Sequence, residues 1–255
     1  MILHIPHASR EIPAGLRDQI VLSDEELASE LREMTDAFTD TLFTCRGATR
    51  IVFPVSRLIV DPERFLDDDE EPMSQEGMGV IYARTSSGHR LKRELSGEER
   101  ERLINDYYKP HHERLRIAVE DDLASQGNAL IVDCHSFPRQ PTPCDRDQSV
   151  PRPDFCVGTD SFHTPRGLKR RTMEAILRGG FSVEENRPYA GTMVPAAYYR
   201  TDPRVWSIMI EVCRDLYMDE KSDCTNENFF RIHLSIEELL RNLVHYSDNE
   251  TLLRF

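Results

Sequence analysis

The chain of 255 residues is 39% hydrophobic and 8% aromatic, which is enough apolar material for a sizeable core and argues against global disorder. Its 32 basic and 45 acidic residues give a formal charge of −13 at pH 7, which argues against nucleic acid or an anionic membrane as a partner. We expect one domain over residues 1–255, in which an anionic small substrate would need a local basic pocket.

The cysteines and the N-terminal segment bear on where the protein works. The six cysteines form no CxxC pair, and several lie in apolar runs such as IVDCHS, so we expect reduced, mostly buried thiols. The start MILHIPHAS has no basic segment followed by a long apolar stretch, and no segment approaches the length of a membrane span. We therefore expect a cytoplasmic protein.

Short β-branched runs alternate with long amphipathic segments, a pattern typical of an α/β fold in which helices cover both faces of a sheet. In chain order, the expected strands are Ile2–Ile5, Arg50–Pro54, Leu58–Val60, Ala129–Asp133, Asp154–Gly158, Phe181–Val183 and Ser207–Val212. The runs ALIVD and SIMIEV are apolar without alternation, as in strands buried on both faces. These two strands are therefore expected at the centre of the sheet.

Four helices are expected along the chain. Two capping boxes of the form Ser-x-x-Glu, which begin at Ser23 and Ser96, open the first two. In the first helix apolar residues recur at helical spacing as far as Leu42, and the second is expected to be interrupted or kinked at Pro110. The two later helices are expected at about 163–178 and 226–246. The Pro-rich stretch Pro138–Pro153 is expected to be a long loop, either a solvated connector or a lid.

Two histidines stand out because ligands of α/β sheets gather beyond the carboxyl ends of the strands. His7 follows the first expected strand, and His135 follows the apolar run ALIVD. Neutral imidazole is the commonest zinc ligand, although each histidine taken alone could equally be a hydrogen-bonded structural residue. His4 lies within the first strand, on the opposite face from His7, and is expected to be structural. A nucleophilic role for Cys134 is disfavoured, because it should point away from His135.

Glu211 is the most unusual carboxylate in the sequence. It ends an apolar run that should be fully buried, and buried charges are rare unless they are paired or functional. Burial would raise its pKa, which suits a general base and acid acting on a metal-bound water. The alternative is a structural ion pair with Arg214 or another arginine.

An ordered set of segments along most of the chain is similar to one known family. The segments are IPHAS, TDAFTD, SRLIVDPERF, GVIYAR, YYKPHH, LIVDCHSFP, NRPYAGT and IEVCRDLYMDE. With these the chain resembles the N-formylglutamate amidohydrolases, which are related to zinc carboxypeptidases and aspartoacylases. The resemblance implies a single-domain, mixed and mostly parallel sheet flanked by helices, a zinc ion held by two histidines and a carboxylate, and a glutamate that promotes water. His7, His135 and Glu211 fall where those roles would be carried.

The resemblance makes Asp36, in TDAFTD, the expected third zinc ligand. The related peptidases place their carboxylate three residues after the first histidine, but position 10 of this chain is Arg10. Helical periodicity disagrees with Asp36, since on an unbroken helix it would lie opposite the apolar stripe. The assignment therefore requires that the helix ends or breaks near Thr35, or that its other side faces the site.

The substrate contacts are also taken from the resemblance. Where aspartoacylases read DLNR, this chain reads DPER, so it keeps Arg64 for the substrate carboxylate and has Glu63 in place of the asparagine. Arg57 is expected to polarise the scissile carbonyl. The other expected substrate-binding residues are Asn186, Arg200 and Arg204.

The expected function is zinc-dependent cleavage of the amide of an N-formyl or N-acyl amino acid. The specific reaction implied is N-formyl-L-glutamate to formate and L-glutamate, a step in histidine degradation, with a small anionic substrate and a monomeric or homodimeric enzyme. Two alternatives stay open. One is a metallohydrolase of a different N-acyl amino acid or a peptide, and the other is a non-catalytic binding protein on the same fold.

Overall fold

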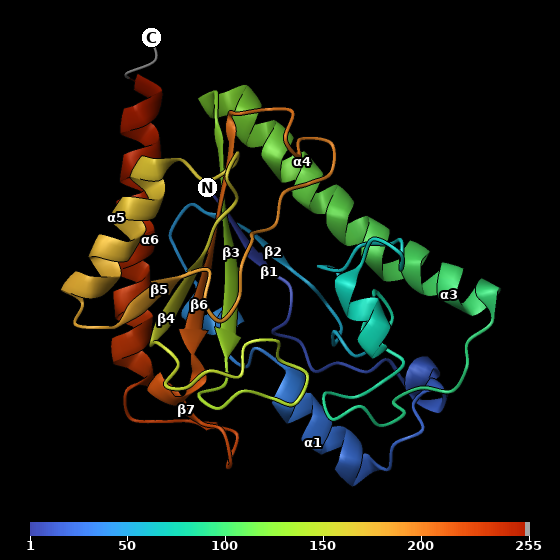
Figure 1. Cartoon of the computed structure of the whole chain (residues 1–255). Helices are drawn as coiled ribbons and strands as arrows, with labels where there is room; N and C mark the ends of the chain where they lie inside the picture. The colour runs from blue at the N-terminus through green and yellow to red at the C-terminus, as the bar shows by residue number, and fades with distance from the viewer. Residues whose placement is uncertain (253–255) are drawn as a thin grey trace.

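The computed structural model describes residues 1–252, with side chains through residue 247. A six-stranded sheet with the order β2-β1-β3-β6-β4-β5 forms its centre (Figure 1). All neighbouring strands are parallel except β4 and β6, so the mixed, mostly parallel sheet expected from the sequence is confirmed. The strands are β1 (Ile2–Ile5), β2 (Thr49–Val52), β3 (Ala129–Phe137), β4 (Phe155–Gly158), β5 (Val183–Glu185) and β6 (Val205–Cys213), and β7 (Met218–Asp219) pairs with β8 (Cys224–Thr225).

The two strands expected at the centre, β3 and β6, lie side by side, and both are buried over all nine residues. Their parallel pairing continues beyond the predicted ends, so that His135 lies within β3 rather than after it and pairs in register with Glu211. Cys134 packs into the core on the opposite face of β3, as expected from strand geometry. The face that carries His135 and Glu211 is therefore free to form a site.

Helices cover both faces of the sheet (Figure 1), as the sequence predicts. Alternate side chains of β1 and β3 pack on α5 and α6 on one face and on α4 on the other, because successive strand residues point to opposite sides. The helices are α1 (Asp24–Met34), α2 (Thr39–Leu42), α3 (Gly97–Leu103), α4 (Lys109–Gln126), α5 (Arg166–Arg178) and α6 (Phe229–Leu252). Short 3-10 helices occupy Ala14–Gln19, Pro72–Glu76 and Arg214–Leu216. Among the described helices, none combines the length and the apolar character that a membrane span requires.

The first helical segment ends at Met34, just before Asp36, as the assignment of Asp36 to the site requires. The capping box at Ser23 opens α1, which ends at Met34, and Thr35 is extended with ψ 134°. Phe38 then adopts a left-handed conformation with φ 64° before the short helix α2 begins. The apolar stripe that runs to Leu42 therefore spans two helices, and the intervening turn frees Asp36 from the helical face on which periodicity would place it.

The second helical segment is interrupted next to Pro110, as expected: a π-helical turn over Ile104–Tyr108 separates α3 from α4, and the proline lies in the first turn of α4. Another expectation meets a different outcome. The predicted strand Leu58–Val60 is wrong, because these residues form a turn closed by a hydrogen bond from Ile59 N to Ser56 O. All three are fully buried, in a second core that lies outside the sheet.

Candidate active site

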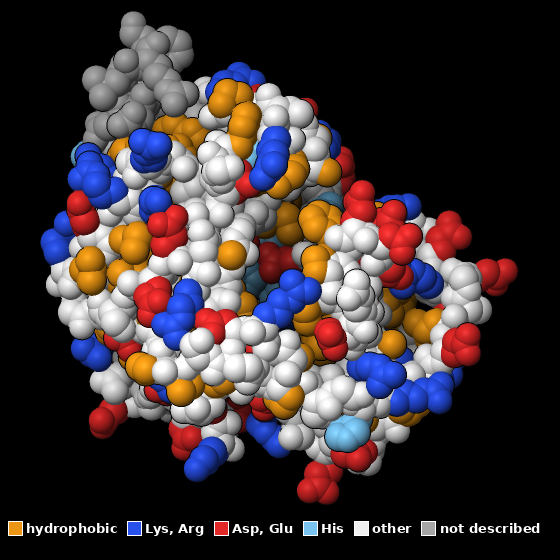
Figure 2. All heavy atoms as spheres, in the orientation of Figure 1, with side chains coloured by type: hydrophobic (Ala, Val, Ile, Leu, Met, Phe, Trp, Pro, Cys, Tyr) orange, Lys and Arg blue, Asp and Glu red, His pale blue; other side chains and the backbone are white. Residues whose placement is uncertain are grey.

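A cavity of about 520 Å³ opens at the carboxyl ends of β1, β3 and β6. Figure 2 shows it as a hollow in the middle of one face, with an acidic side chain on its floor and basic side chains at its rim. The lining comes from the ends of these strands, from the turns around residues 57–73 and from the loop after β3. The structure therefore places a cavity where the fold predicts a ligand.

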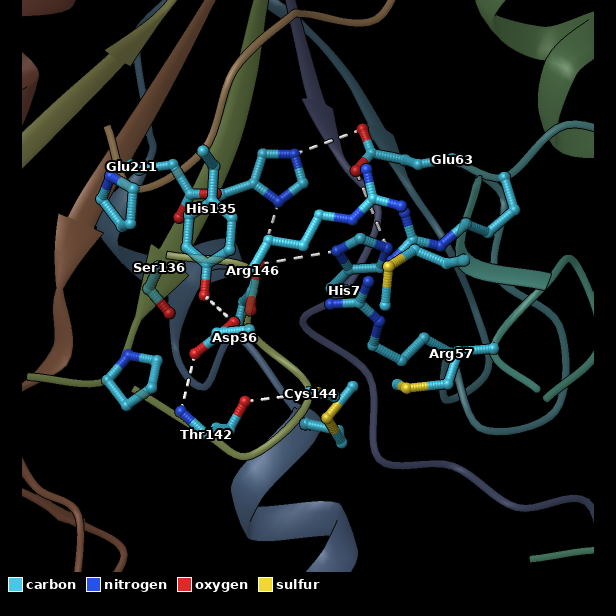
Figure 3. A pocket seen from close by; sticks show the side chains of 18 of the residues that line it. His7, Asp36, Arg57, Glu63, His135, Ser136, Thr142, Cys144, Arg146 and Glu211 are labelled. Atoms are coloured by element: carbon cyan, nitrogen blue, oxygen red, sulfur yellow. Dashed lines mark hydrogen bonds and ion pairs between the residues drawn. The ribbon is translucent and has the colours of Figure 1, made fainter. Parts of the chain in front are cut away.

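Two almost fully buried histidines, His7 and His135, form one wall of this cavity, with ring centroids 5.1 Å apart (Figure 3). The Nε2 of His7 is 2.9 Å from Oδ1 of Asp61. The Nε2 of His135 is 3.1 Å from Oδ1 of Asp133. When such an Nε2–H donates to a carboxylate, the Nδ1 of the neutral imidazole keeps a free lone pair.

Asp36 lies on the Nδ1 side of both histidines. Its Oδ2 is 3.6 Å from Nδ1 of His7 and 3.0 Å from Nδ1 of His135. The break after α1 brings it here, since its backbone N–H donates to the carbonyl of His7 over 3.0 Å. Burial by itself would raise the pKa of Asp36, but the hydrogen bond from His135 and the nearby imidazole of His7 together outweigh burial and hold the pKa well below its ordinary value. The three residues expected as metal ligands are therefore brought together.

A further carboxylate, Glu63, lies on the Nε2 side of the same histidines. Its Oε1 is 3.2 Å from Nε2 of His135, and its Oε2 is 3.8 Å from Nε2 of His7. Donor atoms of His7, Glu63 and His135 all lie within 4.8 Å of one another. From the sequence, Glu63 is expected only to replace the asparagine of the DLNR motif. The sequence feature that could have indicated Glu63 is its position two residues after Asp61. In the structure the backbone N–H of Glu63 donates to Oδ1 of Asp61 over 3.0 Å.

His4 supports this arrangement from behind and is fully buried. Its Nδ1 is 2.7 Å from Oδ1 of Asp133, and its Nε2 is 2.8 Å from Nε2 of His111 in α4. These contacts fit the structural role expected for His4, because they fix the aspartate that contacts His135.

Glu211 faces the cavity from β6, directly across from His135. Its Oε2 is buried and has no hydrogen-bond partner among the described residues. Burial is the largest cause that raises its pKa to about 8, with the negative charges of Asp36, Glu63 and Asp133 acting in the same direction and His135 opposing them. The pairing with Arg214 is absent, because that guanidinium donates to the Glu33 carbonyl over 2.8 Å and lies 3.6 Å from Oδ1 of Asp36.

Arg57 lines the cavity and is fixed by Asp61. Its Nη2 lies 2.8 Å and its Nε 3.2 Å from Oδ2 of that carboxylate, to which the hydroxyl of Tyr82 also donates over 2.5 Å. Burial opposes ionisation of Asp61, but the positive charge of Arg57 prevails and holds the pKa of the carboxyl well below its ordinary value. Asp61 therefore stays ionised as the partner of His7.

Of the residues expected to bind substrate, only Arg64 lines the cavity. Asn186 lies just after β5, and its Nδ2 donates a hydrogen bond of 2.9 Å to the hydroxyl of Thr159. Arg200 and Arg204 precede β6, and Glu211 lies seven residues of strand, roughly 23 Å, beyond Arg204 at the other end of the sheet. The structure does not bring these three residues into the site, because closeness in sequence to Glu211 does not place them at the same end of the strand.

Comparison with known proteins agrees with the fold. The sequence model of N-formylglutamate amidohydrolase, FGase, matches residues 1–218. N-formylglutamate deformylase of Pseudomonas putida is 24% identical over 234 residues, covering 88% of this chain and 84% of that protein. The Pseudomonas aeruginosa deformylase is 25% identical over 237 residues, covering 87% and 83%. The crystal structure of N-formylglutamate amidohydrolase from Ralstonia eutropha JMP134 superposes with a TM-score of 0.87 at 27% identity, covering 98% of this chain and 94% of that one.

Proposed function

Because the chain belongs to the N-formylglutamate amidohydrolase family, we propose that it hydrolyses the amide of an N-acyl amino acid, N-formyl-L-glutamate in particular, to formate and L-glutamate. We further propose that a zinc ion held by His7, His135 and Asp36 supports the reaction. One observation carries the proposal: the Nδ1 atoms of two buried histidines converge on one carboxylate, beside Glu211, whose buried Oε2 has no hydrogen-bond partner among the described residues.

The donor set fits zinc. Nδ1 of His7 is buried and has no hydrogen-bond partner among the described residues, while the Nε2 of the same ring is held by Asp61. Two imidazole nitrogens and one carboxylate oxygen form a typical zinc set that leaves a position open for substrate or water. We favour Asp36 over Glu63 as the carboxylate, because Glu63 approaches the Nε2 atoms, which already contact aspartates. When bound, zinc polarises the substrate carbonyl and lowers the pKa of water.

Glu211 is the proposed proton carrier. As a base it takes a proton from the attacking water as the new carbon–oxygen bond forms, and as an acid it gives that proton to the leaving nitrogen when the carbon–nitrogen bond breaks. The raised pKa of about 8 makes both forms accessible near neutral pH. Its Oε2, which has no partner among the described residues, is free to contact the substrate.

The two cavity arginines bind different parts of the substrate in this proposal. Arg57 is immobilised by Asp61 and presents a fixed positive charge to the oxygen that becomes negative during attack. Arg64 has a buried Nε without a hydrogen-bond partner among the described residues, and the nearest Asp61 oxygen is 3.6 Å away. A guanidinium with free donors suits the substrate carboxylate next to the amide.

The test replaces Glu211 with glutamine, which keeps the size of the side chain and removes its proton transfer. We expect Glu211→Gln to retain zinc and to bind substrate, and to lose about 10²- to 10⁴-fold in kcat/KM. Glu33→Gln is the matched control, because Glu33 is an exposed residue of the same cavity wall and its replacement should leave the rate near that of wild type. Hydrolysis at the wild-type rate by zinc-loaded Glu211→Gln would refute the mechanism.

A further inference from the structure

One cavity arginine remains without a carboxylate partner. Arg57, Arg64 and Arg214 each lie within 4.0 Å of a carboxylate oxygen. For Arg146 the part of the chain that the structure describes offers no ion pair, and its Nη2 donates to the carbonyl of Pro72 over 3.2 Å. Arg146 therefore presents to the cavity a positive charge that forms no ion pair with any described carboxylate.

The loop that carries Arg146 holds it in a fixed place. The neighbouring Asp145 forms an ion pair of 2.9 Å with Arg152, whose side chain is fully buried. Asp145 also accepts hydrogen bonds of 2.7 Å from the backbone N–H of Thr142 and 2.7 Å from the hydroxyl of Tyr189. A loop braced in this way presents its exposed arginine at little cost in conformational entropy when a ligand binds.

Arg146 and Arg64 lie at different depths of the site. Arg64 is 3.6 Å from Asp61, which in turn contacts His7, so it lies next to the reacting centre. Arg146 is exposed and reaches from the loop into the same cavity (Figure 3), where its backbone contact is Pro72. In an N-acyl amino diacid the α-carboxylate lies one carbon from the amide nitrogen, and the side-chain carboxylate lies farther from the amide. The two carboxylates therefore match the two arginines in order.

We propose that Arg146 forms a subsite for the side-chain carboxylate of the substrate and so makes the enzyme selective for N-acyl derivatives of acidic amino acids. This inference rests on the proposed function and assigns to Arg146 the second charge of the substrate. The chain carries a formal charge of −13, so a dianion needs a local cation that is not already neutralised. Arg146 meets that need because its guanidinium can donate two parallel hydrogen bonds to a carboxylate.

The experiment compares three substrates on wild type and Arg146→Met: N-formyl-L-glutamate, N-formyl-L-glutamine and the 1-amide of N-formyl-L-glutamate. We expect Arg146→Met to lower the glutamate-to-glutamine ratio of kcat/KM by about 10- to 100-fold, chiefly through KM. The glutamate-to-1-amide ratio should stay within about three-fold, because the α-carboxylate keeps Arg64. Arg146→Lys should retain part of the preference.

Arg166→Met is the matched control, since this exposed arginine at the start of α5 lies outside the cavity and its loss changes the net charge equally. It should leave all three rates near those of wild type. An equal fall on glutamate and glutamine in Arg146→Met would show that the residue only braces the Pro72 turn, and an unchanged ratio would show no contact; either result overturns the inference.

The subsite and the proposed function can fail separately. If wild type hydrolyses none of the three compounds, the proposed function is wrong. The subsite is then tested by calorimetry, which measures the affinities of wild type and Arg146→Met for N-formyl-L-glutamate and N-formyl-L-glutamine. A loss of about 10- to 100-fold in the preference for the glutamate compound in Arg146→Met supports the subsite. Equal affinities of the two compounds for wild type overturn it.

Discussion

Lys92 is a buried amine whose protonation should make the stability of the protein depend on pH. It is only 3% exposed, and its Nζ donates to the carbonyls of Leu58 and Tyr82. Among the described residues it has no carboxylate partner, and burial lowers its pKa from 10.5 to about 7. Leu58 lies between Arg57 and Asp61, and the hydroxyl of Tyr82 donates to Asp61, so the lysine braces one wall of the site.

The direction and the size of this pH dependence of the unfolding free energy follow from proton linkage. Between the folded pKa of about 7 and the unfolded value of 10.5, the unfolded chain binds more protons than the folded one, so the free energy of unfolding rises with pH. Below the folded pKa the full penalty of protonating the buried amine applies, and above the unfolded value it vanishes. One pKa unit corresponds to about 1.4 kcal/mol, and with partial titration near pH 7 the gain from pH 7 to pH 9 is about 2 kcal/mol.

The assay is chemical denaturation of wild type and Lys92→Met at pH 7, 8 and 9. Methionine keeps the length of the side chain and removes the titration, and the two lost hydrogen bonds shift its stability by an amount that does not depend on pH. We expect the unfolding free energy of wild type minus that of Lys92→Met to rise by about 2 kcal/mol over this range. A constant difference would mean that Lys92 is not titrating in the folded state, and the reasoning from burial would be refuted.

The metal and the loop give two further expectations. Asp36→Ala should weaken zinc binding by at least about 100-fold in chelator competition, whereas Glu63→Gln should change it by less than about ten-fold; the reverse order would move the ligand role to Glu63. Arg152→Met should lower the free energy of unfolding by about 3 kcal/mol in urea titrations, because it leaves Asp145 without its buried cation. The exposed pair of Arg170 provides the control, where Arg170→Met should cost less than about 0.5 kcal/mol, and similar costs would contradict the argument from burial.

The sheet could be predicted because its central strands are long apolar runs that only a doubly covered sheet explains. The same reasoning failed at Leu58–Val60, where three apolar residues occur in a turn. A short apolar run indicates that its residues are buried but does not indicate their backbone conformation. These three residues pack in a second hydrophobic core that includes Tyr82. Such a core depends on long-range packing, so no local pattern shows it.

The site could be predicted where a residue follows from strand geometry. His7 follows β1, and His135 and Glu211 lie within β3 and β6 near their carboxyl ends, where the register of the two strands aligns them. Asp36 could be placed in the site only by assuming that the helix ends at Thr35. Helical periodicity alone predicts a continuous helix there. Arg146 was missed because its position depends on contacts between its loop and distant residues, which the sequence of the loop does not reveal.

These contacts also answer whether the loop after β3 acts as a lid. Thr142, Asp145 and Arg152 tie the loop to itself, and Tyr189 ties it to the segment after β5. Opening the loop as a whole would keep the Asp145–Arg152 ion pair, which lies within it, but would break the hydrogen bond from Tyr189 to Asp145 and the ion pair between Arg187 and Asp147. We therefore expect the loop to act as a wall, so that the proposed substrate selection would depend on charges held at fixed positions. A fixed wall also predicts that Arg146→Lys, whose ammonium group cannot form a planar two-point contact, retains only part of the selectivity proposed for Arg146.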